Sequence, residues 1–142
     1  MHLRVVLRLL ICAGSAWREG GLGRVSEMGS RFRLINIEKG MPSVDQARDR
    51  LADELRRASR DGVKVMKIIH GYGSTGVGGK LREALRKSLK QKVKLGQIKG
   101  IVVGEDWGIF EPLTRQCLDC CPELRRDPDL ERGNPGITVI LL

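Results

Sequence analysis

The segment from Gly71 to Gly79 has the composition of an anion-binding loop. It reads Gly-Tyr-Gly-Ser-Thr-Gly-Val-Gly-Gly and lies between an apolar run that ends at His70 and a basic run that begins at Lys80. Glycines at a junction between a strand and a helix let backbone N–H groups point at an anion, and the helix N-terminus adds partial positive charge. The spacing therefore predicts a phosphate-binding site formed by Gly71, Gly73, Ser74, Gly76, Gly78, Gly79 and Lys80.

A basic helix is predicted directly after this segment. Small and apolar residues recur at helical spacing from Leu81 to Leu89 and predict one buried face. The opposite face is diluted only by Glu83 and carries Lys80, Arg82, Arg86, Lys87 and Lys90. A basic face that continues from a phosphate site is typical of proteins that bind a polyanion through its backbone.

The charge balance of the whole chain agrees with a polyanionic partner. The 142 residues include 26 Lys and Arg against 17 Asp and Glu, which gives a net charge of +9. Such an excess favours DNA, RNA, the ribosome or an anionic membrane surface. Only two Trp, one Tyr and two Phe are present, so base stacking is not expected to be the main mode of recognition.

Two nucleotide-binding motifs resemble the glycine segment without matching it in full. Gly71 to Gly76 satisfies the dinucleotide pattern G-x-G-x-x-G, but Gly78-Gly79 should delay the helix, and the position about 20 residues on holds Lys94 rather than an acid. A Walker A loop would need glycine at Ser74 and a hydroxyl residue at Leu81. A nucleotide- or small-anion-binding protein, such as an oxidoreductase, stays open as an alternative.

The elements around this segment predict an α/β fold. Strands are expected at residues 32–37, 63–69, 98–103 and 137–142. Besides the basic helix, one helix should run from a capping box at Ser43 and Gln46 to Asp61-Gly62, and a short one over residues 113–121. This order predicts parallel early strands with right-handed crossovers, and the first two helices on one face of the sheet.

The cysteines favour a reducing cytoplasm, because three of the four are too crowded for an ordinary disulfide framework. They are Cys12, Cys117, Cys120 and Cys121. A zinc site needs four ligands, and His2 and His70 lie far from the cluster in sequence, so no metal site is predicted. Cys117 and Cys121 are one helical turn apart and are expected to pack as small apolar side chains.

Residues 1–30 are expected to lie outside the folded domain, which is assigned to residues 31–142. Met1 to Ala16 begins like a secretory signal, but Arg8 interrupts its apolar run, which is also too short to cross a bilayer as a helix. Polar, glycine-rich residues follow, and Met28 stands just before the first patterned strand. We therefore expect a disordered extension or a true start at Met28, and no membrane partner.

His70-Gly71-Tyr72-Gly73 and Gly78-Gly79-Lys80-Leu81-Arg82 resemble the second signature of the Smr (small MutS-related) domain. That signature is a strand ending in His-Gly-x-Gly, a Ser/Gly-rich loop and a helix beginning near Gly-Gly-x-Leu-Arg. The resemblance extends from about Phe32 to Leu142. It implies a two-layer α/β sandwich with a mixed four-stranded sheet, similar to the C-terminal domain of translation initiation factor three. It also implies that a stand-alone member of the family binds or nicks nucleic acid.

The chain departs from the family at the first signature, Leu-Asp-x-His, which is tied to nuclease activity. The matching residues are Ile35-Asn36-Ile37-Glu38, so an amide replaces the acid and a carboxylate replaces the imidazole. A nuclease would use Glu38 as base or metal ligand, with a divalent metal, and His70 to move a proton near neutral pH. Otherwise Glu38 is a solvated strand end and His70 a turn histidine bonded to backbone, since no second carboxylate is spaced to complete a metal site.

Three functions follow from these patterns. The main hypothesis is a nucleic-acid-binding module that contacts phosphates of DNA or RNA, or the ribosome, without base-specific readout. The alternatives are structure-selective nicking of DNA or RNA and the binding of a nucleotide. Gly104-Glu105-Asp106-Trp107 is a further candidate site, with a strand-ending turn and a core tryptophan as the alternative.

Overall fold

The computed structural model describes residues 30–72 and 77–142. The expected extension, up to residue 29, lies outside the described residues. In chain order the elements are β1 (Phe32–Asn36), α3 (Val44–Arg60), β2 (Val65–Ile69), α4 (Val77–Lys94), β3 (Gly100–Val103), the 3-10 helix η1 (Gly104–Asp106), α5 (Pro112–Cys120), the 3-10 helix η2 (Pro122–Arg126) and β4 (Ile137–Leu141). The predicted α/β class is confirmed, and the predicted strands and helices are present with slightly different ends.

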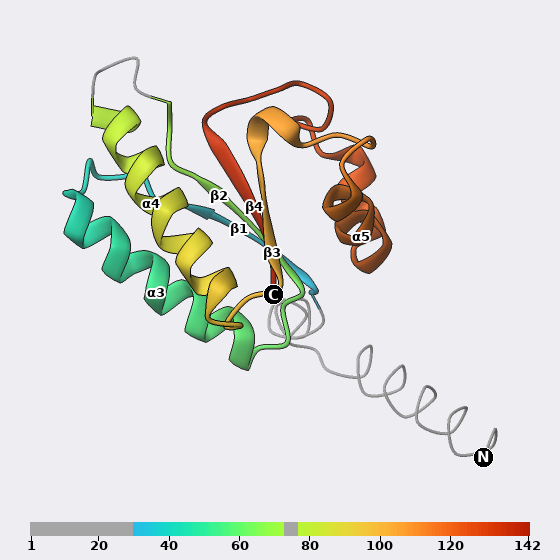
Figure 1. The fold of residues 1–142 in the computed structure, drawn as a ribbon, viewed down its shortest axis with the longest axis horizontal. Helices are drawn as coiled ribbons and strands as arrows, with labels where there is room; N and C mark the ends of the chain where they lie inside the picture. Colours follow the sequence, from blue (N-terminus) through green and yellow to red (C-terminus); the bar gives the residue numbers. More distant parts are fainter. Residues whose placement is uncertain (1–29, 73–76) are drawn as a thin grey trace, which may run out of the picture. The chain divides into compact units, whose positions relative to one another are not determined.

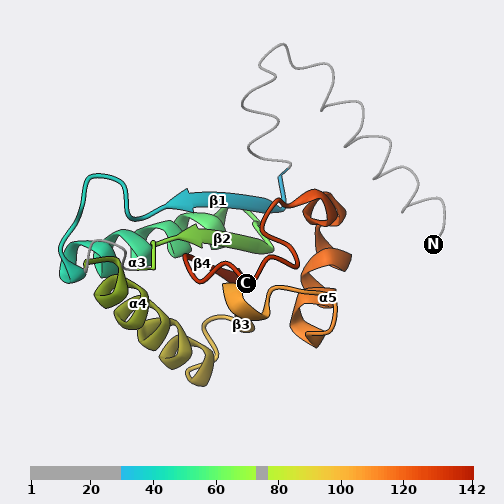
Figure 2. The ribbon, with the colours of Figure 1, turned by 90° about the horizontal axis from the view of Figure 1, so that it is seen from above.

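The four strands form one mixed sheet in the order β1-β2-β4-β3. β1 and β2 are parallel, as predicted, whereas β4 is antiparallel to both of its neighbours, β2 and β3. Figure 2 shows β1 and β3 at the two edges of the sheet. In the register, Asn36 pairs with Ile69, Ile69 with Ile137, and Val103 with Thr138. The carboxyl ends of β1, β2 and β3 and the amino end of β4 therefore lie at the same end of the sheet along the strand direction.

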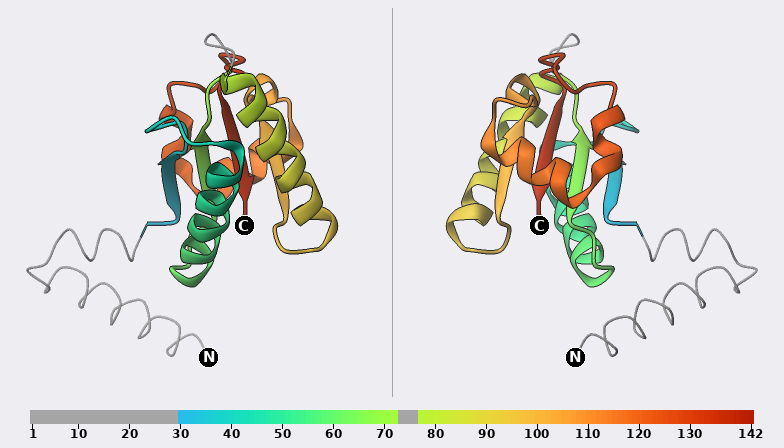
Figure 3. Two further views of the ribbon diagram at one scale, coloured as in Figure 1. Left: turned by 90° about the vertical axis from the view of Figure 1, so that its left-hand side faces the viewer. Right: turned by 90° about the vertical axis from the view of Figure 1, so that its right-hand side faces the viewer.

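α3 and α4 cover one face of the sheet, as expected, and lie side by side (Figures 1 and 3). α3 begins with the predicted capping box, in which Gln46 N–H donates to Ser43 Oγ at 3.2 Å and Ser43 N–H to Gln46 Oε1 at 2.9 Å. The two helices bury their apolar stripes against the same strand residues. This core includes Leu51, Leu55, Leu81, Leu85, Leu89, Met66, Ile68 and Ile140. The burial of so many leucines fixes α4 on the sheet.

α5 and η2 cover the opposite face and lie to the right of the strands in Figure 1, whereas α3 and α4 lie to their left. The predicted two-layer arrangement therefore has additional short helices on the second face of the sheet, because β2 and β4 also place apolar residues on that face. The second core includes Val65, Val139, Leu141, Cys117, Leu118, Leu124 and Trp107.

One lysine lies within this second core and ties the chain after η2 to the sheet. Lys67, in the central strand β2, is 5% exposed, and its ammonium is 2.7 Å from Asp127 Oδ1 and also bonds Asp129. Asp127 accepts a hydrogen bond from Trp107 Nε1 at 3.0 Å, and Asp129 accepts one from Asn134 Nδ2 at 2.9 Å. A charge removed from water this far must be paired to be tolerated. The network fixes the segment that leads into β4.

Candidate nucleic-acid interface

The glycine segment begins where β2 ends, beside the end of β1. Ile37 N–H donates to the Ile69 carbonyl at 2.9 Å, which carries the next residue, Glu38, to the side of Gly71. The exposed Glu38 carboxylate lies so close to Gly71 that a methyl group on residue 71 would overlap it. Gly71 also has φ +77°, a backbone conformation that favours glycine. The structure thus brings together Glu38 and the start of the predicted loop.

α4 begins at Val77, so Gly78 and Gly79 lie in its first turn and do not delay it. Each glycine costs about 1 kcal/mol in a helix interior, and the burial of the leucines further along α4 outweighs that cost. This start removes one objection to the dinucleotide motif, but the antiparallel β4 in the middle of the sheet differs from the parallel sheet of that fold. Gly73, Ser74 and Gly76 lie outside the described residues.

His70 is buried between β2, β4 and α4, with no exposed surface. Its Nδ1 is 2.7 Å from the Gly71 carbonyl and its Nε2 is 2.8 Å from Thr138 Oγ1. A carbonyl only accepts, so Nδ1 carries the proton and Nε2 accepts from the threonine hydroxyl. Burial, together with the positive charges of Arg86 and Arg82, lowers the pKa of His70 from 6.5 to about 4. The imidazole is neutral at physiological pH and holds the Gly71 carbonyl in place.

Arg86 does not lie on the exposed basic face where the helical pattern placed it. Its guanidinium donates to both carboxylate oxygens of Glu105, at 2.7 and 3.1 Å, and to Thr138 Oγ1 at 3.1 Å. It also donates to the carbonyls of Pro135 and Ile137, at 3.3 and 3.0 Å. These bonds hold the pKa of Glu105 below its usual range. Arg86 therefore joins α4 to the segment that follows β3 and to the segment that leads into β4.

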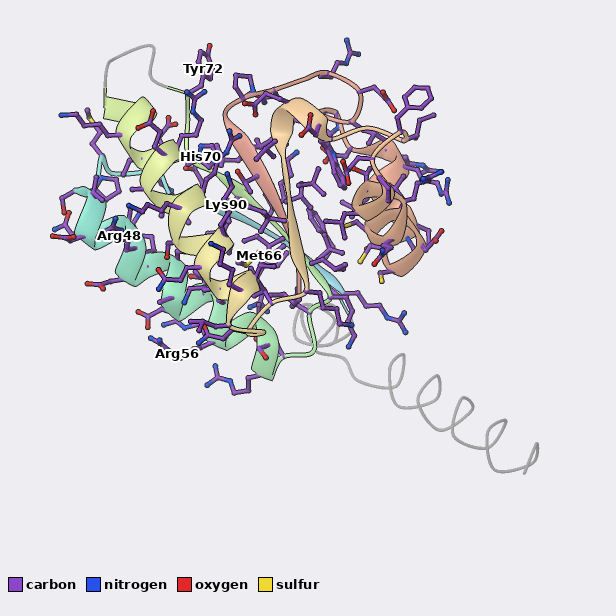
Figure 4. The ribbon with its side chains drawn as sticks, viewed as in Figure 1. Arg48, Arg56, Met66, His70, Tyr72 and Lys90 are labelled. Atoms are coloured by element: carbon purple, nitrogen blue, oxygen red, sulfur yellow. The ribbon has the colours of Figure 1, made fainter. Side chains whose placement is uncertain are left out.

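A row of exposed lysines on α4 is left for an outside partner. Among the described residues none of the four makes an ion pair, and only Glu83 interrupts their positive charge. We call them the lysine row: Lys80, Lys87, Lys90 and Lys94. Figure 4 shows Lys90 on α4, and Arg82 lies half-buried at the margin of the row. Of the predicted phosphate contacts, Lys80, Lys87 and Lys90 thus share one exposed surface with the first turn of α4.

Thr138 was missed from the sequence, although it links His70 to Arg86 through one hydroxyl. The available signal was a hydroxyl residue inside the otherwise apolar run Ile137 to Leu142. A buried hydroxyl needs a partner, so such a residue in a central strand marks a polar contact across the core.

The segment Gly104 to Trp107 forms a turn that packs against the start of β4. Gly104 lies against the Asn134 backbone carbonyl, and Trp107 is almost fully buried. The turn borders a hollow of about 550 Å³ whose lining includes Glu105, Asp106, Glu111 and Glu131. Within residues 30–72 and 77–142, no cluster of three His, Cys, Asp or Glu side chains is placed to hold a metal ion. The arrangement fits the turn with a core tryptophan.

The described cysteines are free thiols that pack in the second core. Burial raises the pKa of Cys117 to about 12 and that of Cys121 to about 11. Both therefore stay protonated at neutral pH and pack as apolar side chains.

The described helices include none that combines the length and apolarity needed to cross a membrane.

Residues 39–101 match the family model of the Smr domain. The matched range contains α3, β2, the glycine segment and α4, and therefore the whole second signature. Comparison with curated proteins and with solved structures finds no match. Ile35 to Glu38, where the sequence predicts an altered first signature, lie just before the matched range, so that alteration stays a prediction. The likeness to the initiation factor domain stays a prediction as well.

Proposed function

Since the chain is a member of the Smr domain family, we propose that it binds nucleic acid through the phosphate backbone. The contact surface is the lysine row, the first turn of α4 and the glycine segment that leads into it. The coarser expectation, a role in binding or nicking nucleic acid, comes from the family. The choice of surface is supported by the charges of α4.

The observation that carries the proposal is that the cations of α4 and α3 differ in their partners. On α3, Arg48, Arg56 and Arg57 each pair with a carboxylate three residues earlier on the same helix. The lysine row has no such partners in the part of the chain that the structure describes. The first turn of α4 also contains no acidic residue, so the helix dipole there is not compensated. Phosphates are therefore attracted to α4 more strongly than to α3.

This surface contacts backbone and not base edges. Lysines are flexible point charges, and phosphates carry no sequence information. Binding should then be insensitive to sequence, should be similar for DNA and RNA of the same shape, and should weaken steeply with salt as counterions are released. A ribosomal site would be one RNA surface of this kind.

The test compares two double variants with the same change in net charge. Lys87→Gln/Lys90→Gln removes two members of the lysine row, and Arg48→Gln/Arg56→Gln removes two paired cations from α3 (Figure 4). Affinity for short DNA and RNA is measured by fluorescence anisotropy over a series of salt concentrations. We expect the α4 variant to lower the salt slope by about 0.7 per lost contact on single strands, or about 0.9 on duplex, and the α3 variant to leave it unchanged. Equal slopes in both variants would refute the proposed surface.

A second candidate function, nicking, is favoured by the position of Glu38. Its exposed carboxylate lies at the start of the glycine segment, where a phosphate held by the loop would be within reach of a base or of a bound divalent metal. In that function Glu38 is the catalytic group, and His70 holds the Gly71 carbonyl. Cleavage of branched DNA and single-stranded RNA with magnesium or manganese, by wild type against Glu38→Gln, tests it. Equal cleavage by both proteins, or none by wild type, would exclude a catalytic Glu38.

A further inference from the structure

An exposed aromatic ring stands at the start of the glycine segment. Tyr72 is 56% exposed, and Figure 4 shows its side chain pointing away from the body of the domain at the end of β2. Phe110 is also exposed, but it borders the hollow lined by Glu105, Glu111 and Glu131, whose charge repels phosphates. Of the aromatic rings in residues 30–72 and 77–142, Tyr72 is therefore the exposed one that lies beside the proposed phosphate surface.

The ring rests on a fixed support. Tyr72 Cδ1 would be 3.2 Å from a β-carbon on Gly136, so the glycine makes room for the ring. Gly136 N–H donates to Asn134 Oδ1 at 2.9 Å, and Asn134 in turn is held by Asp129, which bonds Lys67 of the central strand. A ring that is held in place before binding loses less conformational entropy when it contacts a ligand.

The backbone of Tyr72 is oriented as well. His70 Nδ1 donates a hydrogen bond to the Gly71 carbonyl, which belongs to the same peptide group as the Tyr72 N–H. The Gly71 N–H donates to the Gly136 carbonyl at 3.1 Å, whereas the Tyr72 N–H has no partner among the described residues. In a trans peptide the N–H points opposite to the carbonyl, so that of Tyr72 points away from His70, and no described residue accepts a hydrogen bond from it.

We propose that Tyr72 stacks on an unpaired base of the bound nucleic acid, with its N–H directed at a phosphate oxygen of the same strand. This inference rests on the proposed function and narrows the ligand to strands with an unpaired or splayed base. Bases inside a duplex have both faces covered by their neighbours, whereas an unpaired base offers a face to an aromatic ring. One ring adds to the phosphate contacts and does not replace them, in agreement with the few aromatic residues of the chain.

The experiment measures three proteins on two probes at one salt concentration. The proteins are wild type, Tyr72→Ala and Tyr72→Phe, and the probes are a single-stranded oligonucleotide and a blunt-ended duplex of two annealed strands, each as DNA and as RNA. We expect Tyr72→Ala to weaken single-strand binding about five- to 100-fold, Tyr72→Phe to retain it, and duplex binding to be unchanged. A 2-aminopurine placed in the single strand should be quenched by wild type and by Tyr72→Phe, and less by Tyr72→Ala.

The outcomes separate this inference from the function on which it rests. If Tyr72→Ala binds single strands as tightly as wild type while Lys87→Gln/Lys90→Gln weakens binding, stacking is wrong and the phosphate surface stands. If Tyr72→Ala loses single-strand and duplex binding equally, the unpaired-base preference is wrong. If wild type binds none of the probes, both proposals fall. Because the Tyr72 side chain is exposed, unchanged circular dichroism and an unchanged urea midpoint serve as the folding control.

Discussion

Replacing Arg86 with alanine should unfold the domain more readily, whereas the same change at Lys90, one turn further along α4, should not. The helical pattern placed both residues on one basic face, but Arg86 makes five hydrogen bonds within the protein and Lys90 is exposed. The two substitutions therefore form a matched pair on one helix.

The expected cost of Arg86→Ala follows from its acceptors. The ion pair with Glu105 contributes only about 1 kcal/mol, since the Glu105 side chain is 44% exposed and water screens it. The Ile137 carbonyl and the Thr138 hydroxyl are buried, and loss of a donor to such groups costs about 1–3 kcal/mol. Together these terms give a loss of about 2–4 kcal/mol, against less than about 0.5 kcal/mol for Lys90→Ala. Arg86→Lys should not restore the loss, because an ammonium cannot match the planar donor fork.

Urea unfolding followed by circular dichroism measures both variants, and anisotropy with a single-stranded probe measures their salt slopes. Lys90→Ala should keep the stability of wild type and lower the salt slope by about 0.7. Arg86→Ala should lose stability. Its salt slope, measured without urea at a temperature at which the variant is folded, should equal that of wild type. If Arg86→Ala were as stable as Lys90→Ala, or lowered the slope with no loss of stability, Arg86 would be a phosphate contact and the reasoning would be wrong.

Three further predictions concern buried or crowded charges. The pKa of His70 is near 4 in the folded protein and near 6.5 in the unfolded chain, so unfolding takes up a proton at a pH between these values. The free energy of unfolding should therefore be highest above pH 6.5 and fall by roughly 3 kcal/mol as the pH drops toward 4. His70→Gln should flatten that fall in pH-dependent urea unfolding, and a His70 pKa near 6.5 in the folded protein by NMR would contradict this. Lys67→Met should cost about 3–5 kcal/mol in urea unfolding, because it leaves Asp127 buried without its cation, whereas an unchanged midpoint would mean that Lys67 is not paired in solution. Glu38→Gln should tighten nucleic-acid binding a few-fold by removing a negative charge beside Gly71, and weaker binding would mean that Glu38 supports the site.

Local patterns in the sequence were enough to locate the elements of the fold but not their order in the sheet. The capping box at Ser43 and the leucines of α4 follow from contacts within about one or two helical turns, so they are visible in the sequence. The insertion of β4 between β2 and β3 depends on pairing across the whole chain. The sequence of Ile137 to Leu141 does not indicate which strands pair with β4 or whether the pairing is parallel, because every position is buried and no alternation distinguishes the two faces.

The candidate site was predicted as a set of residue types and was divided by the fold into two groups with different roles. Charge alone could not separate Arg86 from the lysine row, since its partner Glu105 follows β3, and its acceptors Pro135 and Ile137 precede or begin β4. The partner of the buried Lys67 could not be predicted either, because nothing in the sequence of Val65 to Ile69 indicates that this lysine forms an ion pair with Asp127. Polar contacts across a core become predictable only once the strand order is known.

This division decides how the basic helix should be studied. Charge-reversal of α4 as one patch would remove Arg86 together with the lysine row, and the resulting loss of binding would mix unfolding with the loss of phosphate contacts. The two effects separate physically, because the counterions released on binding depend on exposed cations alone, whereas the free energy of unfolding depends on the buried donor. A set of single variants at Lys80, Lys87 and Lys90 that lowers the salt slope in equal steps at constant stability would assign the surface, and any step that coincides with a fall in the urea midpoint would remove that residue from it.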